Sequence, residues 1–571
     1  MSEDTAPKES DRPWLPYYPL QVKSSYEYPD QNIANFLIDS AHAFPNNEAL
    51  DFLGKSYTYK DLLRQCYKLA NALKQLNVNK GDRVAIMLPN CPQAVIAYYG
   101  GLMAGAVIVQ TNPIYTEREL NLQLVDSGAT TLITLDLLMP RVSKGIEHTE
   151  VKQVVVTSLS DGLPFPKNVL YPIKRRKEHP DLKVKYKAAN GIIRWSSLLK
   201  RGKETPICEK VDADTELAMI QYTGGTTGRP KGVMLTHANL IANAVQLTNW
   251  CYQLEPGKER YLAALPLFHV FGLTVLLNQA IHRAGSLLLI PRFEPKLVLE
   301  TIRRRQPSVF PGAPTMYIAL LNNPLTKEGD LGSIRVCFSG ASPLPRDVQE
   351  QFEQKSGGRL IEGYGLTETS PVSHCNPVWG RRKSGTVGIP LPDTDVIIIG
   401  EDSLDPLPIG EVGEIAVRGP QVMMGYWNRP EETAAVLQNG WLRTGDLGTM
   451  DDEGYFKIVE RKKDVIIAGG FNVYPREVEE VLFEHPAIKE ASVLGVPDQY
   501  RGETVKAFIV LKEGLQVSEM QLDRWCRDRL AAYKVPKQYE FRDSLPMSLI
   551  GKVIRRKLKE DQKSEEGENL K

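Results

Sequence analysis

Cysteine is sparse in this 571-residue chain, and no two of its seven cysteines form a C-x-x-C pair. Closely spaced cysteines usually mark a zinc cluster or the disulfide framework of a small secreted domain. Their absence argues against both kinds of site and favours a reducing compartment. The polar first 18 residues also lack the apolar segment of a secretory signal.

The chain has no excess of either charge, with 70 Lys and Arg against 69 Asp and Glu. It therefore shows no overall bias toward nucleic acid or another anionic partner. No apolar run reaches the ~20 residues of a membrane-spanning helix. The uncharged stretch from Val84 to Thr116 comes nearest, but Pro89, Pro92 and Pro113 interrupt it. We expect a soluble, cytoplasmic protein that binds no nucleic acid.

Short apolar runs alternate with amphipathic segments through most of the chain, which is typical of βαβ units. From about Gly400 the strands become shorter and turns more frequent. We predict an α/β fold: a large N-terminal domain of mainly parallel sheets flanked by helices with a β-rich subdomain, then a small α+β C-terminal domain. The predicted divisions are an extension at 1–27, the large domain at 28–460, a hinge at 461–464, the small domain at 465–558 and a disordered tail at 559–571.

A glycine- and threonine-rich segment, 223–228, is the first candidate site. We expect it to lead from a strand at Leu217–Tyr222 toward a helix at His237–Trp250 that Thr236 caps. Backbone N–H groups in such a loop form a cradle for anions. The spacing is not that of a Walker loop. The candidate residues are Thr223, Gly224, Gly225, Thr226, Thr227, Gly228 and Lys231.

The segment YTGGTTGRPKGV (222–233) closely resembles the phosphate-binding loop of the AMP-forming acyl-CoA synthetase, luciferase and peptide-synthetase adenylation superfamily. Four more segments are similar to motifs of that superfamily and occur in its order. They are GYGLTET (363–369), NGWLRTGDLGTMDDEGYFKIVERKKD (439–464), GGFNVYPREVE (469–479) and IGKVIRRKL (550–558). The resemblance covers residues 28–558, and RPWLPYYP (12–19) is most similar to bacterial long-chain fatty-acid–CoA ligases.

This resemblance implies that the large domain binds ATP, Mg²⁺ and an acid. Attack of a carboxylate on the α-phosphate brings two anions together, so catalysis depends on positioning and positive charge. Mg²⁺ prefers one or two carboxylates with phosphate oxygens and water, a role that the resemblance gives to Glu368, with Thr223 nearby. The remaining residues implied for ATP are Gly340, Ala341, Tyr364, Gly365, Thr367, Asp446 and Arg461, with Tyr364 stacking on adenine and Asp446 accepting from the ribose.

Lys552 is the catalytic lysine that the resemblance implies, and its charge would join the acid's carboxylate to the α-phosphate. Several basic residues surround it, so its position alone does not single it out, and Ile550 replaces the threonine of many relatives. The resemblance also implies a mobile small domain that turns after adenylation to admit CoA. Its hinge residue would be Lys463, and its CoA channel would contain Gly469, Gly470 and Phe471.

The acid site is expected in LPLFHVFGLTVLL (265–277), where the resemblance implies that His269, Phe271 and Gly272 border the acyl group. No aspartate occurs between Leu265 and Asn278 to pair with an amino group, so an amino-acid substrate is disfavoured. An apolar tunnel gains ~0.8 kcal/mol per buried CH₂, which favours a long chain. The alternatives are a medium-chain or aryl-acid–CoA ligase, and an adenylation module that loads a carrier protein.

The segment 173–187 has seven basic and two acidic residues. It is interpreted first as a solvated insertion and second as a contact with an anionic membrane, which would place the protein peripherally at the inner face of the membrane. The expected partners are the fatty acid, ATP and CoA. Assembly into a homodimer is left open.

Overall fold

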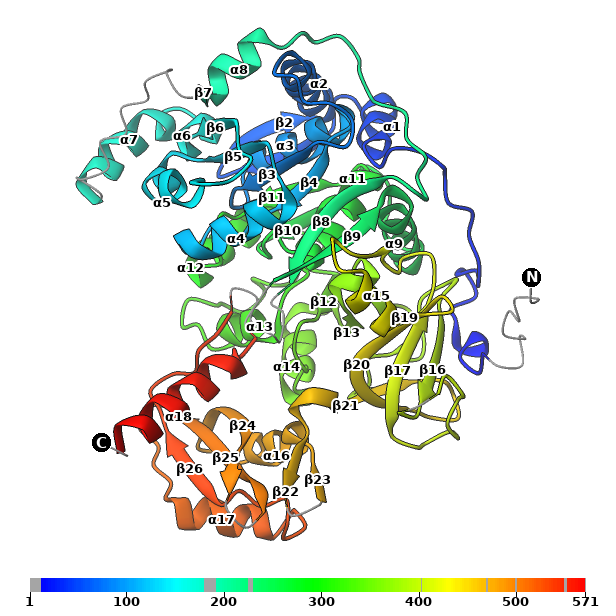
Figure 1. Ribbon diagram of the computed structural model, residues 1–571, viewed down its shortest axis with the longest axis vertical. Coiled ribbons are helices and arrows are strands. Elements are labelled where there is room, and N and C mark those ends of the chain that lie inside the picture. The colour runs from blue at the N-terminus through cyan, green and yellow to red at the C-terminus, as the bar shows by residue number, and fades with distance from the viewer. Residues whose placement is uncertain are drawn as a thin grey trace. The chain divides into compact units, whose positions relative to one another are not determined.

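The computed structural model describes most of the chain, which forms two compact units, and Figure 1 labels their elements. The first unit contains residues 14–395 and 418–442, and the second contains 396–417 and the chain from 443 onward. The described residues are 12–178, 191–223, 230–401, 403–468, 471–498, 501–548 and 552–569.

The first unit is built around an eight-stranded sheet with the order β18-β9-β8-β4-β3-β5-β6-β7. Its strands are β3 (Arg83–Met87), β4 (Val107–Gln110), β5 (Thr131–Leu135), β6 (Gln153–Thr157), β7 (Ile192–Arg194), β8 (Leu217–Thr223), β9 (Lys231–Thr236) and β18 (Gly425–Tyr426). From β8 to β7 the neighbouring strands are parallel, whereas β9 and β18 are antiparallel to their neighbours. Every residue of β4 and β5 is buried, as in parallel sheets covered on both faces.

Two smaller sheets complete the first unit, with the orders β10-β11-β1-β2 and β12-β13-β14-β15. Their strands are β1 (Glu48–Phe52), β2 (Lys55–Thr58), β10 (Arg260–Ala263), β11 (Ser286–Leu289), β12 (Val336–Ser339), β13 (Arg359–Gly365), β14 (Val372–Cys375) and β15 (Ile389–Pro390). Val309 pairs in parallel with Tyr261 of β10 and Val336 of β12. Parallel pairing therefore runs from β11 through β10 and Val309 to β12 and β13, and the carboxyl ends of these strands share one edge.

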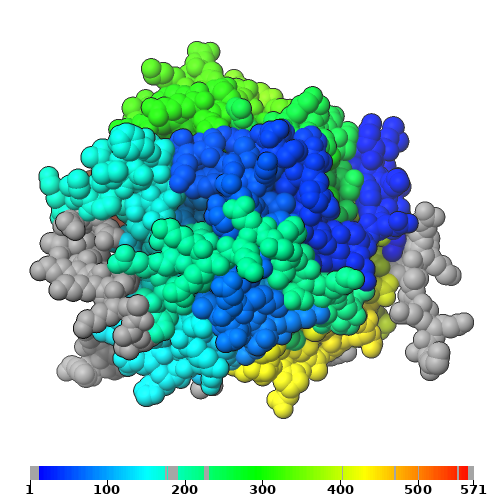
Figure 2. Space-filling view, turned by 90° about the horizontal axis from the view of Figure 1, so that it is seen from above, coloured from blue at the N-terminus to red at the C-terminus, as the bar shows by residue number. Residues whose placement is uncertain are grey.

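Helices cover these sheets. They are α1 (Asn35–Ala43), α2 (Tyr59–Gln75), α3 (Pro92–Met103), α4 (Glu117–Ser127), α5 (Met139–Gly145), α6 (Leu159–Gly162), α7 (Lys167–Glu178), α8 (Trp195–Arg201), α9 (His237–Trp250), α10 (Val270–Gly272), α11 (Gln279–His282), α12 (Pro295–Arg305), α13 (Pro314–Leu321), α14 (Arg346–Ser356) and α15 (Pro430–Val436). Figure 2 shows a face made mostly by the first 200 residues, drawn from blue to green-cyan. The predicted α/β fold with mainly parallel sheets flanked by helices is confirmed.

The second unit holds most of a sheet with the order β16-β17-β20-β19, in which β21 pairs with β20. These strands are β16 (Asp395–Ile399), β17 (Gly413–Arg418), β19 (Leu437–Gln438), β20 (Trp441–Met450) and β21 (Phe456–Arg461). A second sheet has the order β23-β22-β25-β24, with β26 beside β25. It comprises β22 (Ile466–Ala468), β23 (Phe471–Val473), β24 (Ile488–Asp498), β25 (Gly502–Leu511) and β26 (Gln538–Phe541), with helices α16 (Pro475–Phe483), α17 (Glu519–Arg527) and α18 (Arg555–Asn569).

Proline limits pairing in one segment, and one local expectation differs from the structure. Between β10 and β12, residues 308–311 contribute only the bridge residue Val309, because prolines at 307 and 311 limit regular pairing. Where a disordered tail was expected from residue 559, helix α18 continues to Asn569. The Arg556–Glu560 ion pair at 2.6 Å has the i,i+4 spacing that stabilises exposed helices.

Three further features concern the packing of the chain near its start, the apolarity of the helices and the state of the cysteines. The indole of Trp14 is buried, and the Tyr18 hydroxyl donates to the Pro390 carbonyl at 2.7 Å, so the chain near Tyr18 packs on the first unit. Within the described ranges no helix is both long and apolar enough to cross a membrane. All seven cysteines are free thiols.

Candidate functional site

The glycine-rich segment joins two antiparallel strands. Thr223 at the end of β8 pairs with Lys231 at the start of β9. Helix α9 does follow with the expected cap, because the Thr236 side chain accepts from Asn239 N. Strand β9, which was not predicted, stands between the loop and this helix, and its antiparallel pairing with β8 and β18 on either side holds it as a strand. The loop residues Gly224, Gly225, Thr226, Thr227 and Gly228 lie outside the described residues.

Lys231 contacts groups that the sequence did not single out. Its ammonium lies 2.5 Å from Glu432 Oε2 and 4.9 Å from the centroid of the Tyr426 ring. Tyr426 reaches this position because β18 pairs with β9, with Tyr426 opposite Val233. The lysine at the base of the glycine hairpin is therefore held by a carboxylate and an aromatic face.

Glu368 lies in the single turn η5 (Thr367–Thr369) and is half-buried. The Tyr426 hydroxyl donates to its Oε1 at 2.9 Å, and its carbonyl accepts from Met423 N at 2.8 Å. Tyr426 thus connects Glu368 to the hairpin that carries Thr223 and Lys231. This arrangement fixes the carboxylate by an oriented donor.

Glu368 is the one acidic side chain of its turn, η5. Nowhere in the described part of the chain do three His, Cys, Asp or Glu side chains group so that they could hold a metal ion. Mg²⁺ bound on a nucleotide needs fewer protein ligands, since one or two carboxylates, phosphate oxygens and water suffice. A single oriented carboxylate fits that mode of binding.

Tyr364 and Gly365 end strand β13, next to the turn that carries Glu368. The ring of Tyr364 lies 5.6 Å from the ring of His374, a fully buried side chain that the sequence analysis missed. Burial lowers the pKa of His374 to about 3, so a neutral imidazole supports the tyrosine. A Cβ on Gly365 would lie 1.8 Å from the Pro371 carbonyl oxygen, so only glycine fits there.

Gly340 and Ala341 follow β12 directly, at the same strand edge. A Cβ on Gly340 would lie 3.1 Å from the ring of Phe271, so the candidate acyl and nucleotide residues are neighbours here. Ala341 has a φ of 70°, which is uncommon for a residue other than glycine and often accompanies functional sites.

The candidate acyl segment begins with His269, which caps helix α10 by accepting from Phe271 N through Nδ1 at 3.2 Å. This bond assigns the proton of a neutral imidazole to Nε2. Gly272 packs so closely that a Cβ would lie 2.2 Å from the Pro266 carbonyl oxygen. The structure thus gives His269 a cap role and leaves its expected acyl contact a prediction.

A π-helix, η4 (Leu273–Asn278), continues this segment, and all six of its residues are buried. Such short π-helices often occur at functional sites. The Thr274 hydroxyl donates to the Ser370 carbonyl at 2.7 Å, which ties η4 to the turn beside Glu368. The apolar pattern of this segment suits an α-helix equally well, so no signal in the sequence marks the π-helix.

In the second unit, Asp446 and Arg461 face each other across strands β20 and β21. Arg461 Nε lies 2.9 Å from Asp446 Oδ1, and Asp446 is buried. Lys463 follows in the turn η6 (Lys462–Asp464), where partial burial and the nearby Arg461 charge lower its pKa. The two residues expected at the ribose are thus paired, and the expected hinge residue Lys463 lies two positions after Arg461.

Two hydrogen bonds join Lys552 to Ser548: Ser548 N donates to the Lys552 carbonyl at 2.8 Å, and Lys552 N donates to Ser548 Oγ at 3.0 Å. Crowding by protein, followed by repulsion from Arg461, lowers the pKa of Lys552 to about 8. The residue keeps an exposed surface, so its ammonium is crowded but still meets water. Asp446, Arg461 and Lys463 all act on this ammonium although they lie about a hundred residues away in sequence.

Arg555 was missed by the sequence analysis. Its guanidinium lies 3.0 Å from Glu460, 3.3 Å from Asp464 and 2.9 Å from Glu479. Glu460 directly precedes the expected hinge at 461–464, Asp464 is the last residue of that hinge, and Arg555 stands three positions after Lys552. Arg555 therefore ties the Lys552 segment to the expected hinge within this unit.

The expected CoA channel is described only in part. Gly469 and Gly470 lie outside the described residues, and Phe471 begins β23 with 57% of its surface exposed. The Phe471 ring stacks on Tyr533 at 4.8 Å, and Lys534 pairs with Glu477 at 2.6 Å. An exposed phenylalanine stacked on a half-buried tyrosine, with a neighbouring cation, thus follows the glycines.

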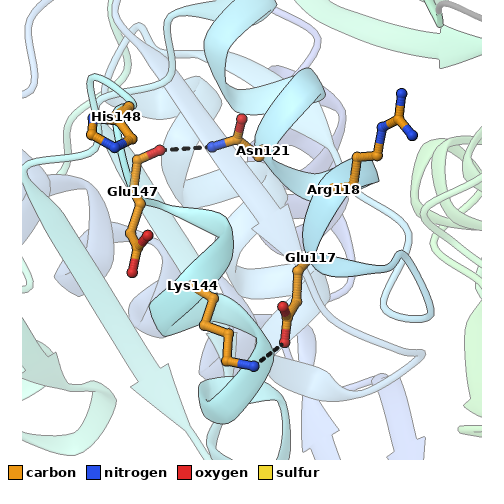
Figure 3. A pocket seen from close by; sticks show the side chains of 6 residues that line it. All are labelled: Glu117, Arg118, Asn121, Lys144, Glu147 and His148. Atoms are coloured by element: carbon orange, nitrogen blue, oxygen red, sulfur yellow. Dashed lines mark hydrogen bonds and ion pairs between the residues drawn. The ribbon is translucent and has the colours of Figure 1, made fainter.

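A surface hollow of about 500 Å³ between α4 and α5 shares no residue with the predicted site. Figure 3 shows its lining, in which Lys144 pairs with Glu117 at 3.0 Å and the Asn121 amide donates to the Glu147 carbonyl. The remaining lining residues are Arg118 and His148. Apart from Asn121 these residues are exposed and carry both signs of charge, as is typical of a solvated surface.

Comparison with known proteins gives this arrangement its family. The family model described as AMP-binding enzyme matches residues 37–427, and the model of the AMP-binding enzyme C-terminal domain matches residues 477–552. The chain belongs to the AMP-binding enzyme family.

Two curated relatives match this chain over nearly its full length. A long-chain-fatty-acid–CoA ligase of Bacillus subtilis (strain 168) is 50% identical over 556 residues, covering 97% of this chain and 99% of the relative. A protein of the same description from Escherichia coli O157:H7 is 40% identical, covering 96% and 98%. Among solved structures, ATP-bound MatB from Rhodopseudomonas palustris is 31% identical, with a TM-score of 0.82 over 93% of this chain and 98% of that one.

Proposed function

We infer that the protein is an AMP-forming long-chain fatty-acid–CoA ligase. The observation that carries this inference is the 50% identity to a long-chain-fatty-acid–CoA ligase over 97% of the chain. In the first step an acid's carboxylate oxygen attacks the α-phosphorus of ATP, and the bond to pyrophosphate breaks. In the second step the sulfur of CoA attacks the acyl carbonyl, AMP leaves, and the thiol proton is lost to solvent.

ATP is proposed to bind beside the β8–β9 hairpin. Lys231 supports this proposal, because its contacts with Glu432 and Tyr426 hold a cation at the base of the glycine-rich loop. The edge formed by Gly340, Ala341 and Tyr364 is proposed to receive adenine. Asp446 and Arg461, already paired at 2.9 Å, are proposed to receive the ribose.

Mg²⁺ is proposed to reach the site with the nucleotide, where it would neutralise charge on the phosphates. Glu368, oriented by Tyr426, is the proposed carboxylate ligand, with Thr223 beside the loop. The chain's own contribution would thus be one fixed carboxylate, with Thr223 at the end of β8 beside it.

The acid is proposed to lie along α10 and η4. Phe271 lies against Gly340, and Thr274 joins η4 to the turn of Glu368, so an acyl chain there would end near the proposed nucleotide site. The segment from 270 to 278 contains no charged residue and is buried throughout. Such a surface favours an alkyl chain over an amino acid.

Lys552 is proposed to act in the first step only, as an ammonium that offsets the negative charge gathering at the α-phosphate. The proposed hinge at 461–464 would let the small domain, 465–558, turn for the second step. Gly469, Gly470 and Phe471 would then border the pantetheine of CoA. A cytoplasmic location and a homodimer are further proposals, and light scattering of the purified chain tests the second.

Initial rates of CoA thioester formation across an acid panel test the function. Saturated acids of increasing length, benzoate and a ferulate-type aryl acid are compared under the same Mg-ATP and CoA concentrations. We expect kcat/KM to rise with chain length, because each added CH₂ is worth ~0.8 kcal/mol when buried. A preference for the aryl or medium-chain acids would replace the inference by that alternative. Acyl transfer to a carrier protein without transfer to free CoA would favour a carrier-loading module.

A further inference from the structure

Helix α7 and the residues just before it carry large apolar side chains that face solvent. Val169, Leu170 and Ile173 are 56%, 57% and 56% exposed, and Phe165 is 82% exposed. At 3.6 residues per turn, Val169, Leu170 and Ile173 fall within an arc of about 100° on the helix. We call Phe165, Val169, Leu170 and Ile173 the α7 apolar row.

This helix differs from those that build the first unit. Helix α2 buries an apolar face and α9 is buried on nearly all sides, whereas none of the described side chains of α7 is buried. A 12-residue helix is marginal in water without packing, and Pro172 in its interior weakens it further. In Figure 1, α7 lies at the edge of the first unit, beyond α6. The apolar row is thus presented outward, on a helix that would gain stability from a cover.

The charge of α7 indicates what covers the row. The sequence of α7 holds five basic residues and one acidic residue. Lys177 is exposed one turn after Ile173 and on the same arc, and the exposed Lys167 begins the helix, with its ammonium donating to the Leu53 carbonyl at 2.9 Å. An apolar stripe flanked by lysines is the pattern of a helix that lies in the plane of an anionic membrane surface.

We propose that the α7 apolar row docks this protein on an anionic phospholipid bilayer. The row enters the boundary between headgroups and acyl chains, and Lys177 meets the anionic headgroups. Only the purpose of this docking rests on the proposed function, since a ligase of long-chain acids would take its substrate from the bilayer. The binding itself requires no enzymatic activity.

Co-sedimentation of the full chain with vesicles tests the docking. Vesicles of phosphatidylglycerol and phosphatidylcholine are compared with vesicles of phosphatidylcholine alone. Wild type is expected to bind the anionic vesicles more tightly, and to lose affinity as salt rises. The triple variant Val169→Gln, Leu170→Gln, Ile173→Gln keeps good helix formers and is expected to bind at least about tenfold more weakly. Lys177→Gln is expected to lower binding to anionic vesicles by about fivefold.

The matched control is the double variant Leu20→Gln, Met520→Gln, which removes apolar side chains that are 100% and 81% exposed elsewhere on the chain. It is expected to bind as wild type does, and all variants are expected to keep the wild-type unfolding midpoint. The proposal is overturned if wild type binds neither vesicle type, or if the control variant weakens binding as much as the triple variant does. It is also overturned if the triple variant dissociates a dimer without altering vesicle binding.

A rate measurement separates this proposal from the proposed function. With a water-soluble short acid, the triple variant is expected to match wild type, because no α7 residue belongs to the proposed active site. With a long-chain acid supplied in anionic vesicles, it is expected to react more slowly. If wild type converts neither the short acid nor the long-chain acid, the proposed ligase activity is refuted. If wild type and the triple variant react equally fast with the long-chain acid supplied in vesicles, the proposed docking is refuted.

Discussion

Replacing Tyr426 by Phe tests whether Glu368 is the carboxylate that receives Mg²⁺. The substitution removes the hydroxyl that donates to Glu368 Oε1 at 2.9 Å but keeps the ring beneath the Lys231 ammonium. A hydrogen bond to a charged group contributes about 1.5–3 kcal/mol, and the half-buried position of Glu368 favours the lower figure. About 1.4 kcal/mol corresponds to a tenfold change. We therefore expect the Mg²⁺ concentration for half-maximal pyrophosphate release to rise about tenfold.

Initial rates of pyrophosphate release are measured against Mg²⁺ at fixed, saturating ATP and fatty acid. At saturating Mg²⁺ the variant should recover most of the wild-type kcat, because the carboxylate itself remains. Tyr59→Phe is the matched control, since it deletes a buried hydroxyl that donates to the Gly285 carbonyl at 2.7 Å. The control should lose some stability and keep its Mg²⁺ dependence. An unchanged Mg²⁺ dependence in Tyr426→Phe would refute the role given to Glu368.

Three further results are expected. Lys552→Ala should lose acyl-AMP formation yet still convert supplied acyl-AMP and CoA to thioester, and an equal loss in both half-reactions would end the proposed division of labour. The pKa of Lys552 is lowered to about 8 and its charged form is the active one, so kcat/KM for pyrophosphate release should fall as pH rises through about 8. Lys552→Arg should remove this alkaline fall in kcat/KM. A wild-type kcat/KM that stays constant up to pH 10 would count against this role. Burial already raises the pKa of Glu479 while the Arg555 charge opposes the rise. Arg555→Met should therefore destabilise the second unit by about 3–5 kcal/mol near pH 7 and by less near pH 5, where the Glu479 carboxylate left without its partner takes up a proton. Hydrogen exchange of β24 and β25 at both pH values measures this, and equal loss at the two values would show that Glu479 is not responsible.

Local signals in the sequence were enough for many elements. Thr236 caps α9 through a residue three positions away, and the predicted helix His237–Trp250 matches the structure because capping and periodicity are local. The helical tail could have been recognised from the spacing of Arg556 and Glu560. Strand β9 was missed because its six residues show no alternating pattern, and pairing with β8 and β18 makes them a strand.

The contacts that organise the candidate site come from distant parts of the chain. Tyr426 lies 58 residues from Glu368, and β18 brings it there by pairing with β9. Arg555 reaches Glu460 across 95 residues. Neither residue has a local pattern that marks its partner, since tertiary pairing alone creates these contacts. Motifs therefore indicated Glu368 and Lys552, and the structure was needed to find the residues that hold their surroundings.

The products formed from one long-chain fatty acid, Mg-ATP and CoA test the central claim most directly. Mass spectrometry of a single reaction should find acyl-CoA, AMP and pyrophosphate in equal amounts, with acyl-AMP accumulating when CoA is left out. ADP and phosphate in place of AMP and pyrophosphate, or no thioester from any long-chain acid, would contradict the account.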